Sequence, residues 1–395
     1  MASIKKNDIK WCDVNTKAER IERGQKVPLR LFNRPSPNSN SIDLKQYHSG
    51  FEDVVGIRPR YSLLLSSDES TGNHLFRNGC VFVQSPAGLV GHLYVMSGPL
   101  QVTNSSALPT ILISHVICDY SSKSDSEESL MEEDEEYRYA FKTTSVEWKK
   151  LRPPKNMPMP AGACSFGRGV LYCSQGTLSS DTGGLWEMPQ NQPPLPVLTS
   201  YLGRPFNSIQ NVVKDRKGGL WFTDASTGFE LDIRPKPKLP NQVYRVDTDG
   251  QNVRVVADGF GRPTGIAVNK DGSTLYVSDT DAIRADGSTD PTRAATIYAF
   301  DIIQRSGSSF LTNRRVFAYA REGVPSAVIC DIEGRVFAAC GDGVEVFSPG
   351  GIALGLIEIL GGCTTICFGS TDKELLIGSG QRLWSFLMRV PIRDS

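Results

Sequence analysis

The chain has 395 residues, in which 43 basic residues balance 43 acidic residues and 22% of all residues are charged. This balance, together with a hydrophobic content of 39%, excludes a disordered polyelectrolyte and argues against a basic nucleic-acid-binding protein. No run of eighteen apolar residues occurs and the amino terminus has no apolar segment, so we expect a cytoplasmic protein without a membrane span. The 37 Gly and 24 Pro residues follow no triplet period and indicate many turns between short strands.

Two polar regions differ from the rest of the chain. Residues 1–50 are polar with interleaved basic residues, and we expect an N-terminal extension that wraps a main body over residues 51–395. Between Asp119 and Glu136 there are nine acidic residues and one lysine. Because such a run is usually a solvated loop, we expect a flexible acidic insertion over residues 119–138, with an interaction segment as the alternative.

A short apolar and aromatic segment, preceded by a turn, recurs along the main body. Its six copies are GHLYV (residues 91–95), GVLYC (169–173), GGLWF (218–222), STLYV (273–277), GRVFA (334–338) and KELLI (373–377). Another apolar segment precedes each copy and a third, with alternating polarity, follows it, which is a repeated hairpin signal. Segments such as 252–258 and 314–320 fit a fourth strand of the repeating unit.

Six units of four strands predict an all-β protein, a six-bladed β-propeller whose radial closure leaves only short sheet edges. A pair of β-sandwiches would also show alternating strands, but sandwiches do not repeat one internal pattern six times. The nine cysteines are odd in number, contain no CxxC pair and mostly lie in apolar segments. We therefore expect buried free thiols in a reducing compartment rather than disulfides.

In a propeller, the turns that lead into the innermost strands converge on one end of the central channel and form the natural pocket. Alignment of the repeats places there Asn78 with Gly79, Ala161 with Gly162, Gln210 with Asn211, Thr264 with Gly265, Ser326 with Ala327, and Thr364 with Thr365. None of these residues is a carboxylate or a histidine. The polar ones either line a pocket or only cap the strand ends.

Several longer segments carry a family resemblance. They include GRPFNS (203–208), GLWFTD (219–224), LPNQVYRVD (239–247), LYVSDT (275–280) and CGDGVEVFSPGG (340–351). These segments resemble a fungal member of the family of senescence marker protein, gluconolactonase and luciferin-regenerating enzyme, a set of six-bladed propellers. Weaker similarity extends towards residue 79.

The resemblance implies a metal site, and this sequence alters it. Lactonases of the family hold one divalent cation with a Glu, an Asn and an Asp, whose positions correspond here to Asn78, Thr264 and Ser326. The family's SPND turn, whose Asn contacts metal or substrate, ends here in Gln210 and Asn211. Ca²⁺ prefers carboxylate oxygens, and Zn²⁺ prefers His, Cys or carboxylate ligands. The replacements therefore predict a channel without a metal cofactor.

The resemblance also suggests a reaction. Fungal natural-product pathways contain propellers of this kind that act as hetero-Diels–Alderases and join a tropolone quinone methide to a humulene-type sesquiterpene. Such a pericyclase needs no metal, but it needs a pocket that aligns the two reactants and hydrogen-bonds the polar end. The alternatives are a metal-dependent lactonase of the gluconolactonase type and a non-catalytic propeller that binds a small molecule.

The expected partner is an apolar small molecule and not a nucleic acid, and the sequence carries no signal for an oligomeric state. The expected catalytic residues are Arg284, Gln210 and Thr264, and the expected substrate-binding residues are Asn78, Asn211, Ser326, Arg77 and Thr364. Asn78, Gln210, Thr264 and Ser326 are expected to donate hydrogen bonds to a substrate oxygen. The two arginines are expected to polarise a carbonyl, unless they are ordinary surface residues. Asp224, Asp279 and Asp331 are expected to form structural hydrogen bonds at strand ends.

Overall fold

The computed structural model describes residues 25–26 and 42–388, apart from residues 57–58, 68–72, 87, 101–108, 121–142, 144, 168, 180–181, 190–191, 248–249 and 285. Most of the expected N-terminal extension and nearly all of the expected acidic insertion lie outside the described residues. Among the described residues, neither of the two α-helices has the length and apolar composition that crossing a membrane requires.

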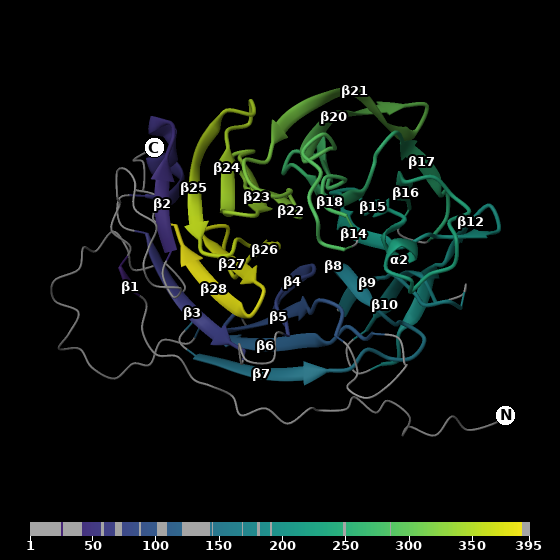
Figure 1. Ribbon diagram of the computed structural model, residues 1–395, viewed down its shortest axis with the longest axis horizontal. Helices are drawn as coiled ribbons and strands as arrows, with labels where there is room; N and C mark the ends of the chain where they lie inside the picture. The colour runs from purple at the N-terminus through teal and green to yellow at the C-terminus, as the bar shows by residue number, and fades with distance from the viewer. Residues whose placement is uncertain are drawn as a thin grey trace.

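Six antiparallel sheets of the described residues are arranged around a central axis, which confirms the predicted six-bladed β-propeller (Figure 1). From blade 1 to blade 6 the innermost strands are β4 (Cys80–Gln84), β8 (Pro160–Phe166), β14 (Ile209–Lys214), β18 (Pro263–Val268), β22 (Ala327–Cys330) and β26 (Thr365–Phe368). The second strands are β5 (Val90–Met96), β9 (Gly169–Ser174), β15 (Leu220–Asp224), β19 (Thr274–Asp279), β23 (Val336–Cys340) and β27 (Glu374–Ser379).

The outer half of each blade completes the repeating unit. The third strands are β6 (Ile113–Asp119), β10 (Gly184–Met188), β16 (Gln242–Val246), β20 (Thr296–Arg305), β24 (Gly343–Phe347) and β28 (Arg382–Leu387). The outermost strands are β7 (Ser145–Leu151), β11 (Leu195–Leu198), β17 (Arg254–Ala257), β21 (Ser308–Tyr319), β25 (Ala353–Ile359) and β3 (Arg60–Ser66).

Contacts between the innermost strands close the ring. β4 contacts β8, and the contacts continue through β14, β18 and β22 to β26, which returns to β4. Blade 6 joins the two ends of the chain, because β3 pairs with β28 and places Leu63 opposite Trp384. This pairing supplies the fourth strand that the carboxyl-terminal segment lacks.

The remaining elements lie outside the four-stranded sheets that form the blades. β2 (Ile42–Gln46) pairs with β25 as a fifth strand of blade 5, and β1 (Gln25–Lys26) pairs with β3. The short helices η1 (Ser49–Phe51) and α1 (Glu52–Val55) follow β2, and Phe51, Val54 and Val55 are buried. β12 (Ser200–Tyr201) and β13 (Arg204–Pro205) form a small hairpin, and α2 (Thr227–Glu230) follows β15.

The core lies between the blades. Six clusters of buried apolar side chains occupy the six junctions of the ring, and Trp221 and Trp384 are fully buried in two of them. Eight cysteines lie in the described part of the chain, and all eight are free thiols, as expected. Burial raises the pKa of the Cys164 thiol to about 12, so this side chain behaves as a small apolar residue.

Candidate functional site

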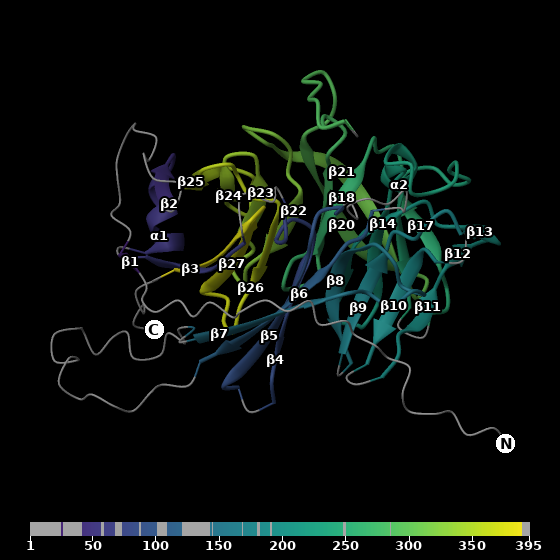
Figure 2. The ribbon, with the colours of Figure 1, turned by 60° about the horizontal axis from the view of Figure 1, so that its bottom comes forward.

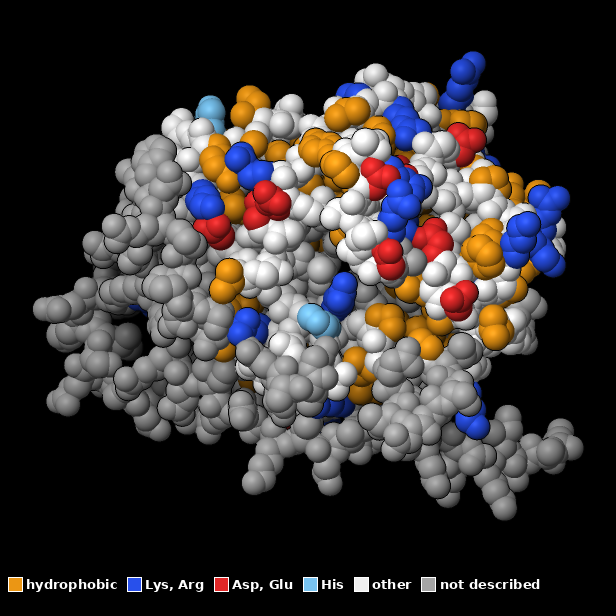
Figure 3. Space-filling model, viewed as in Figure 1, with side chains coloured by type: hydrophobic (Ala, Val, Ile, Leu, Met, Phe, Trp, Pro, Cys, Tyr) orange, Lys and Arg blue, Asp and Glu red, His pale blue; other side chains and the backbone are white. Residues whose placement is uncertain are grey.

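The turns that precede the innermost strands, called the leading turns here, lie on one face of the propeller. This hub face is hollowed near its middle, where a basic side chain and a histidine lie beside the hollow (Figure 3). The leading turns of blades 1, 2 and 3 pack closely. A Cβ on Gly79 would lie 2.6 Å from the Cα of Gly162, and a Cβ on Gly162 would lie 2.5 Å from the carbonyl oxygen of Gln210. Only glycine permits this approach.

Buried aspartates fix two leading turns. Asp224, at the end of β15, accepts hydrogen bonds of 3.0 and 2.7 Å from two backbone N–H groups of its own blade's turn. Asp279, at the end of β19, accepts equivalent bonds of 2.9 and 2.7 Å. Burial raises the pKa of Asp224 to about 7, against the opposing effects of these donors and of Arg234. Asp331 accepts a 2.8 Å bond from the backbone of Arg335, so the expected structural role of all three aspartates is confirmed.

A buried arginine connects the hub-face loops of blades 2 and 3. Arg234 is 3% exposed. Its guanidinium donates to the carbonyl oxygens of Phe206 at 2.7 Å and Asn207 at 2.9 Å, in the leading turn of blade 3. It also donates to those of Thr177 at 2.8 Å and Ser179 at 2.9 Å, in the loop after β9. The leading turn before Gln210 is therefore fixed on both sides: Asp224 accepts from its N–H groups, and Arg234 donates to its carbonyl oxygens.

Gln210 belongs to a hydrogen-bonded chain that reaches blade 2. Its Nε2 donates to the carbonyl oxygen of Ser208 at 2.7 Å and to the Ser208 hydroxyl at 3.1 Å. That hydroxyl donates to Oε1 of Gln175 at 3.2 Å, and both Ser208 and Gln175 are buried. The position of the Gln210 amide is thus set by residues from two blades.

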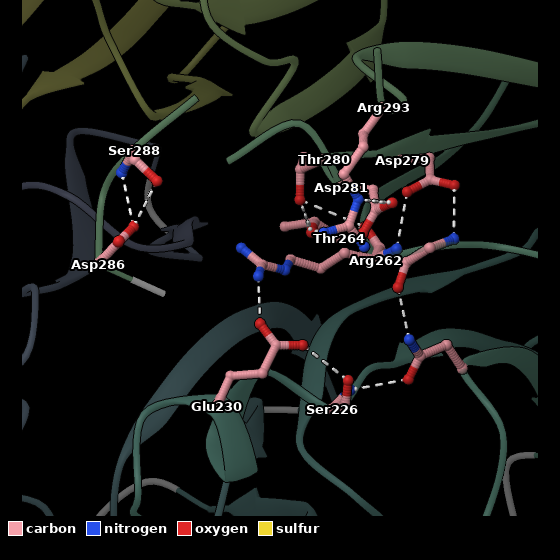
Figure 4. Close-up of polar contacts among 12 residues, drawn as sticks. Ser226, Glu230, Arg262, Thr264, Asp279, Thr280, Asp281, Asp286, Ser288 and Arg293 are labelled. Atoms are coloured by element: carbon pink, nitrogen blue, oxygen red, sulfur yellow. Dashed lines mark hydrogen bonds and ion pairs between the residues drawn. The ribbon is translucent and has the colours of Figure 1, made fainter. Parts of the chain in front are cut away.

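Thr264 lies in a second polar cluster, on blade 4. Its hydroxyl is 2.7 Å from the Thr280 hydroxyl and 3.2 Å from the carbonyl oxygen of Arg262 (Figure 4). The Arg262 guanidinium reaches across to Glu230 of α2 and forms an ion pair with it. Glu230 in turn accepts a 2.9 Å bond from the Ser226 hydroxyl. The Thr264 hydroxyl is therefore engaged within its own blade.

Two expected binding residues have their amides turned towards the backbone. Asn78 is half-buried, and its Nδ2 donates to the carbonyl oxygen of Ser97 at 2.8 Å. In Asn211, Oδ1 accepts a 2.8 Å bond from the N–H of Val212. A Cβ on Gly162 would lie 2.6 Å from this oxygen, so the Asn211 side chain lies against the leading turn of blade 2.

The other expected residues of the leading turns differ in accessibility. Ser326 is half-buried at the start of β22. The Thr364 hydroxyl is buried and has no hydrogen-bond partner among the described residues. Arg77 is exposed beside His74, and burial together with this neighbouring cation lowers the pKa of His74. Ser326 and Thr364 start neighbouring blades, and Arg77 precedes Asn78 on blade 1.

Arg284 lies apart from these hydrogen bonds. It belongs to the loop between β19 and β20, which projects from the hub face (Figure 2). Its side chain is 52% exposed and forms a 2.7 Å ion pair with Asp290 of the same loop. The structure therefore joins Arg284 to Asp290 rather than to Gln210 or Thr264.

The donor set at the hub does not fit the divalent cation that the family resemblance implies. The three corresponding positions carry an amide and two hydroxyls, and the Thr264 hydroxyl is engaged with Thr280. Within the described part of the chain, no group of three or more His, Cys, Asp or Glu residues is arranged to hold a metal ion. Neutral oxygens alone compensate poorly for the dehydration of Ca²⁺.

This propeller with its modified hub belongs to a known family. Residues 137–381 match the family model described as the SMP-30/Gluconolactonase/LRE-like region, so the chain is a member of that family. It is 30% identical over 196 residues to a gluconolactonase of Zymomonas mobilis, an alignment that covers 47% of this chain and 52% of that protein. It is 27% identical over 198 residues to the lactonohydrolase oryL of Aspergillus oryzae, covering 47% of this chain and 45% of oryL. The chain thus spans about half the length of these relatives.

Among solved structures, a gluconolactonase from Xanthomonas campestris superposes with a TM-score of 0.65 at 20% sequence identity. The superposition covers 96% of this chain and 100% of that one. At this level of identity the similarity supports the fold alone.

Sequence reasoning missed the residues that hold the site in place. Arg234 and Gln175 lie in loops after the second strands of blades 3 and 2, where no repeated motif marks them. The ion pair between Arg262 and Glu230 also joins two blades. Neither residue was singled out from the sequence, because their pairing depends on how neighbouring blades pack.

Proposed function

We propose that this protein is an enzyme that binds a small, largely apolar molecule at the hub face and acts on it without a divalent cation. The observation that carries the proposal is the replacement of the family's ligand positions by Asn78, Thr264 and Ser326. Five of the six leading turns carry polar, uncharged side chains, which can orient a substrate but cannot generate a metal-bound hydroxide.

The specific reaction that we propose is a hetero-Diels–Alder addition. A hydroxymethyl tropolone loses its enolic hydrogen and its hydroxymethyl OH together as one water molecule, which gives a quinone methide. The O=C–C=C unit of the quinone methide and one alkene of a humulene-type sesquiterpene then form one C–O and one C–C bond without loss of atoms. The protein accelerates these steps by holding the two reactants in one arrangement.

Two side chains of the leading turns can supply hydrogen bonds to the tropolone carbonyl. The exposed Arg77 guanidinium is one. The other is Nδ2 of Asn211, because Oδ1 of that amide is already bound to the N–H of Val212. Donors directed at a carbonyl oxygen stabilise the charge that develops there during the addition.

A lactonase is the second candidate, and the comparisons favour it. Both curated relatives described above are named as enzymes that act on lactones. A lactonase built on this hub would have to activate water with groups other than the family's usual ligands, since those positions are neutral here.

The test incubates the purified protein with a hydroxymethyl tropolone and a humulene-type alcohol in excess EDTA. We expect one stereoisomer of the adduct to form at least about tenfold faster than in buffer, and Arg77→Leu to lose most of this acceleration. Arg305→Leu, at the exposed end of β20, serves as the control and should retain the wild-type rate.

Two results would contradict the proposal. Product ratios and rates equal to those in buffer would leave a binding protein without catalysis. Hydrolysis of a sugar or aryl lactone that stops in EDTA and returns with Ca²⁺ would establish the lactonase instead.

A further inference from the structure

A backbone carbonyl group, that of Ser97, determines the orientation of the Asn78 side-chain amide. One atom of its amide lies 2.8 Å from the carbonyl oxygen of Ser97, and a carbonyl oxygen can only accept. That amide atom must therefore be the nitrogen. The amide oxygen, Oδ1, is left without a hydrogen bond to any described residue and is not among the buried polar atoms.

Gln210 repeats this arrangement on blade 3. Its Nε2 lies 2.7 Å from the carbonyl oxygen of Ser208, so the same reasoning assigns the nitrogen to the inner side. Its Oε1 has no partner among the described residues and is not a buried atom. Both amides thus present an acceptor to the surroundings, which differs from the donor role expected from the sequence.

The two acceptors come from leading turns that flank a glycine. Gly162 is in contact range of Gly79, next to Asn78, and of the Gln210 backbone, so three turns meet at a position that carries no side chain. The Asn211 side chain lies against Gly162, and its Nδ2 is an amide donor, because its Oδ1 already accepts from the N–H of Val212. The contact at Gly162 therefore brings together three turns that carry two acceptors and one donor, and it is itself too tight to admit an added group.

We infer that Asn78 and Gln210 determine specificity by accepting hydrogen bonds from a substrate hydroxyl, so that the ligand class is a hydroxylated molecule and not its ether or hydrocarbon analogue. This inference rests on the proposed function, since it places the hydroxyl of that substrate at the hub. An ether cannot donate, and two desolvated acceptors would remain unsatisfied in its complex.

The experiment measures the dissociation constants of a hydroxymethyl tropolone and of its fully O-methylated ether by titration calorimetry. We expect the wild-type protein to bind the hydroxylated probe at least about tenfold more tightly. Asn78→Leu and Gln210→Leu should each weaken binding of this probe while leaving the affinity for the ether nearly unchanged. A variant that failed to fold would instead lose both ligands.

Gln84→Leu is the matched control. Gln84 also donates its Nε2 to a backbone carbonyl, that of Gly88 at 2.7 Å, but it lies at the other end of β4. It should retain the full preference for the hydroxylated probe. Equal wild-type affinities for the two probes, a preference that survives in both leucine variants, or no binding of either probe would overturn the inference.

The proposed function can fail separately. A hydroxyl preference without accelerated cycloaddition would support the acceptor pair and contradict the pericyclase. Accelerated cycloaddition with equal affinity for both probes would support the pericyclase and contradict the acceptor pair.

Discussion

Replacement of Arg234 by methionine is expected to lower the free energy of unfolding by about 3 to 5 kcal/mol, the usual cost of removing one partner from a buried charged network. The methionine can fill much of the volume, but it leaves four backbone carbonyl oxygens without their donor. It also removes the cation that lowers the pKa of buried Asp224, so this carboxyl should become still harder to ionise.

Urea denaturation followed by tryptophan fluorescence measures this effect. Arg284→Met is the control, because Arg284 forms only an exposed ion pair, which should contribute little to stability. Arg234→Lys should recover part of the loss, since lysine keeps the charge but cannot reach all four carbonyls. An Arg234→Met variant as stable as Arg284→Met would show that the loops of blades 2 and 3 are held by other contacts.

The blades could be predicted from the sequence because each repeat carries its own local signal. In β19, Leu275 and Val277 are completely buried and Tyr276 nearly so, and the turn before the strand contains a glycine. Such a strand packs against neighbouring blades on both of its faces, so its residues are apolar without interruption. This continuous run can be recognised from the strand's own residues.

The closure of the ring could not be predicted in the same way. β3 is an apolar strand near the start of the chain, and its pairing with β28 joins segments that lie more than 300 residues apart. Judged from its sequence alone, an apolar strand of this composition could be the outermost strand of any blade. The choice depends on where the circle of blades ends, which is a property of the whole fold.

The candidate site shows a similar division. The repeat fixed which residues occupy the leading turns, so Asn78, Gln210 and Thr264 could be placed at the hub from the sequence. The direction of each polar group could not, because it depends on partners such as the Ser97 and Ser208 carbonyls or the Thr280 hydroxyl. For this reason the sequence predicted that the amides of Asn78 and Gln210 donate hydrogen bonds, whereas the structure leaves their amide oxygens free to accept them.

Acidification is expected to weaken the junction between blades 1 and 2. Nδ1 of His92 lies 3.1 Å from Nε2 of His115, and the His115 ring stacks on Tyr94 with centroids 4.6 Å apart. Burial is the main cause that lowers the pKa of His115 to about 4, and His92 and Lys149 lower it further, while Glu147 opposes them. Burial also lowers the pKa of His92.

The direction follows from proton binding. Between pH 6.5 and about 4 the unfolded chain binds a proton at His115 that the folded protein excludes, so this group makes stability fall as the pH falls. The shift corresponds to a loss of about 3 kcal/mol at most. Carboxyls with raised pKa, such as Asp224, act in the opposite direction, so the effect of His115 has to be isolated by comparison.

The comparison uses His115→Gln, which keeps a polar side chain but cannot titrate. Unfolding free energies measured in urea from pH 7 to pH 4.5 should fall less steeply for this variant than for the wild-type protein, by about 2 kcal/mol over the range. His48→Gln is the control, because the exposed His48 only caps a short turn by accepting from the N–H of Gly50. Its pH profile should parallel that of the wild type. Parallel profiles for all three proteins would mean that His115 takes up its proton in the fold as readily as in the unfolded chain, and that the two imidazoles separate without cost.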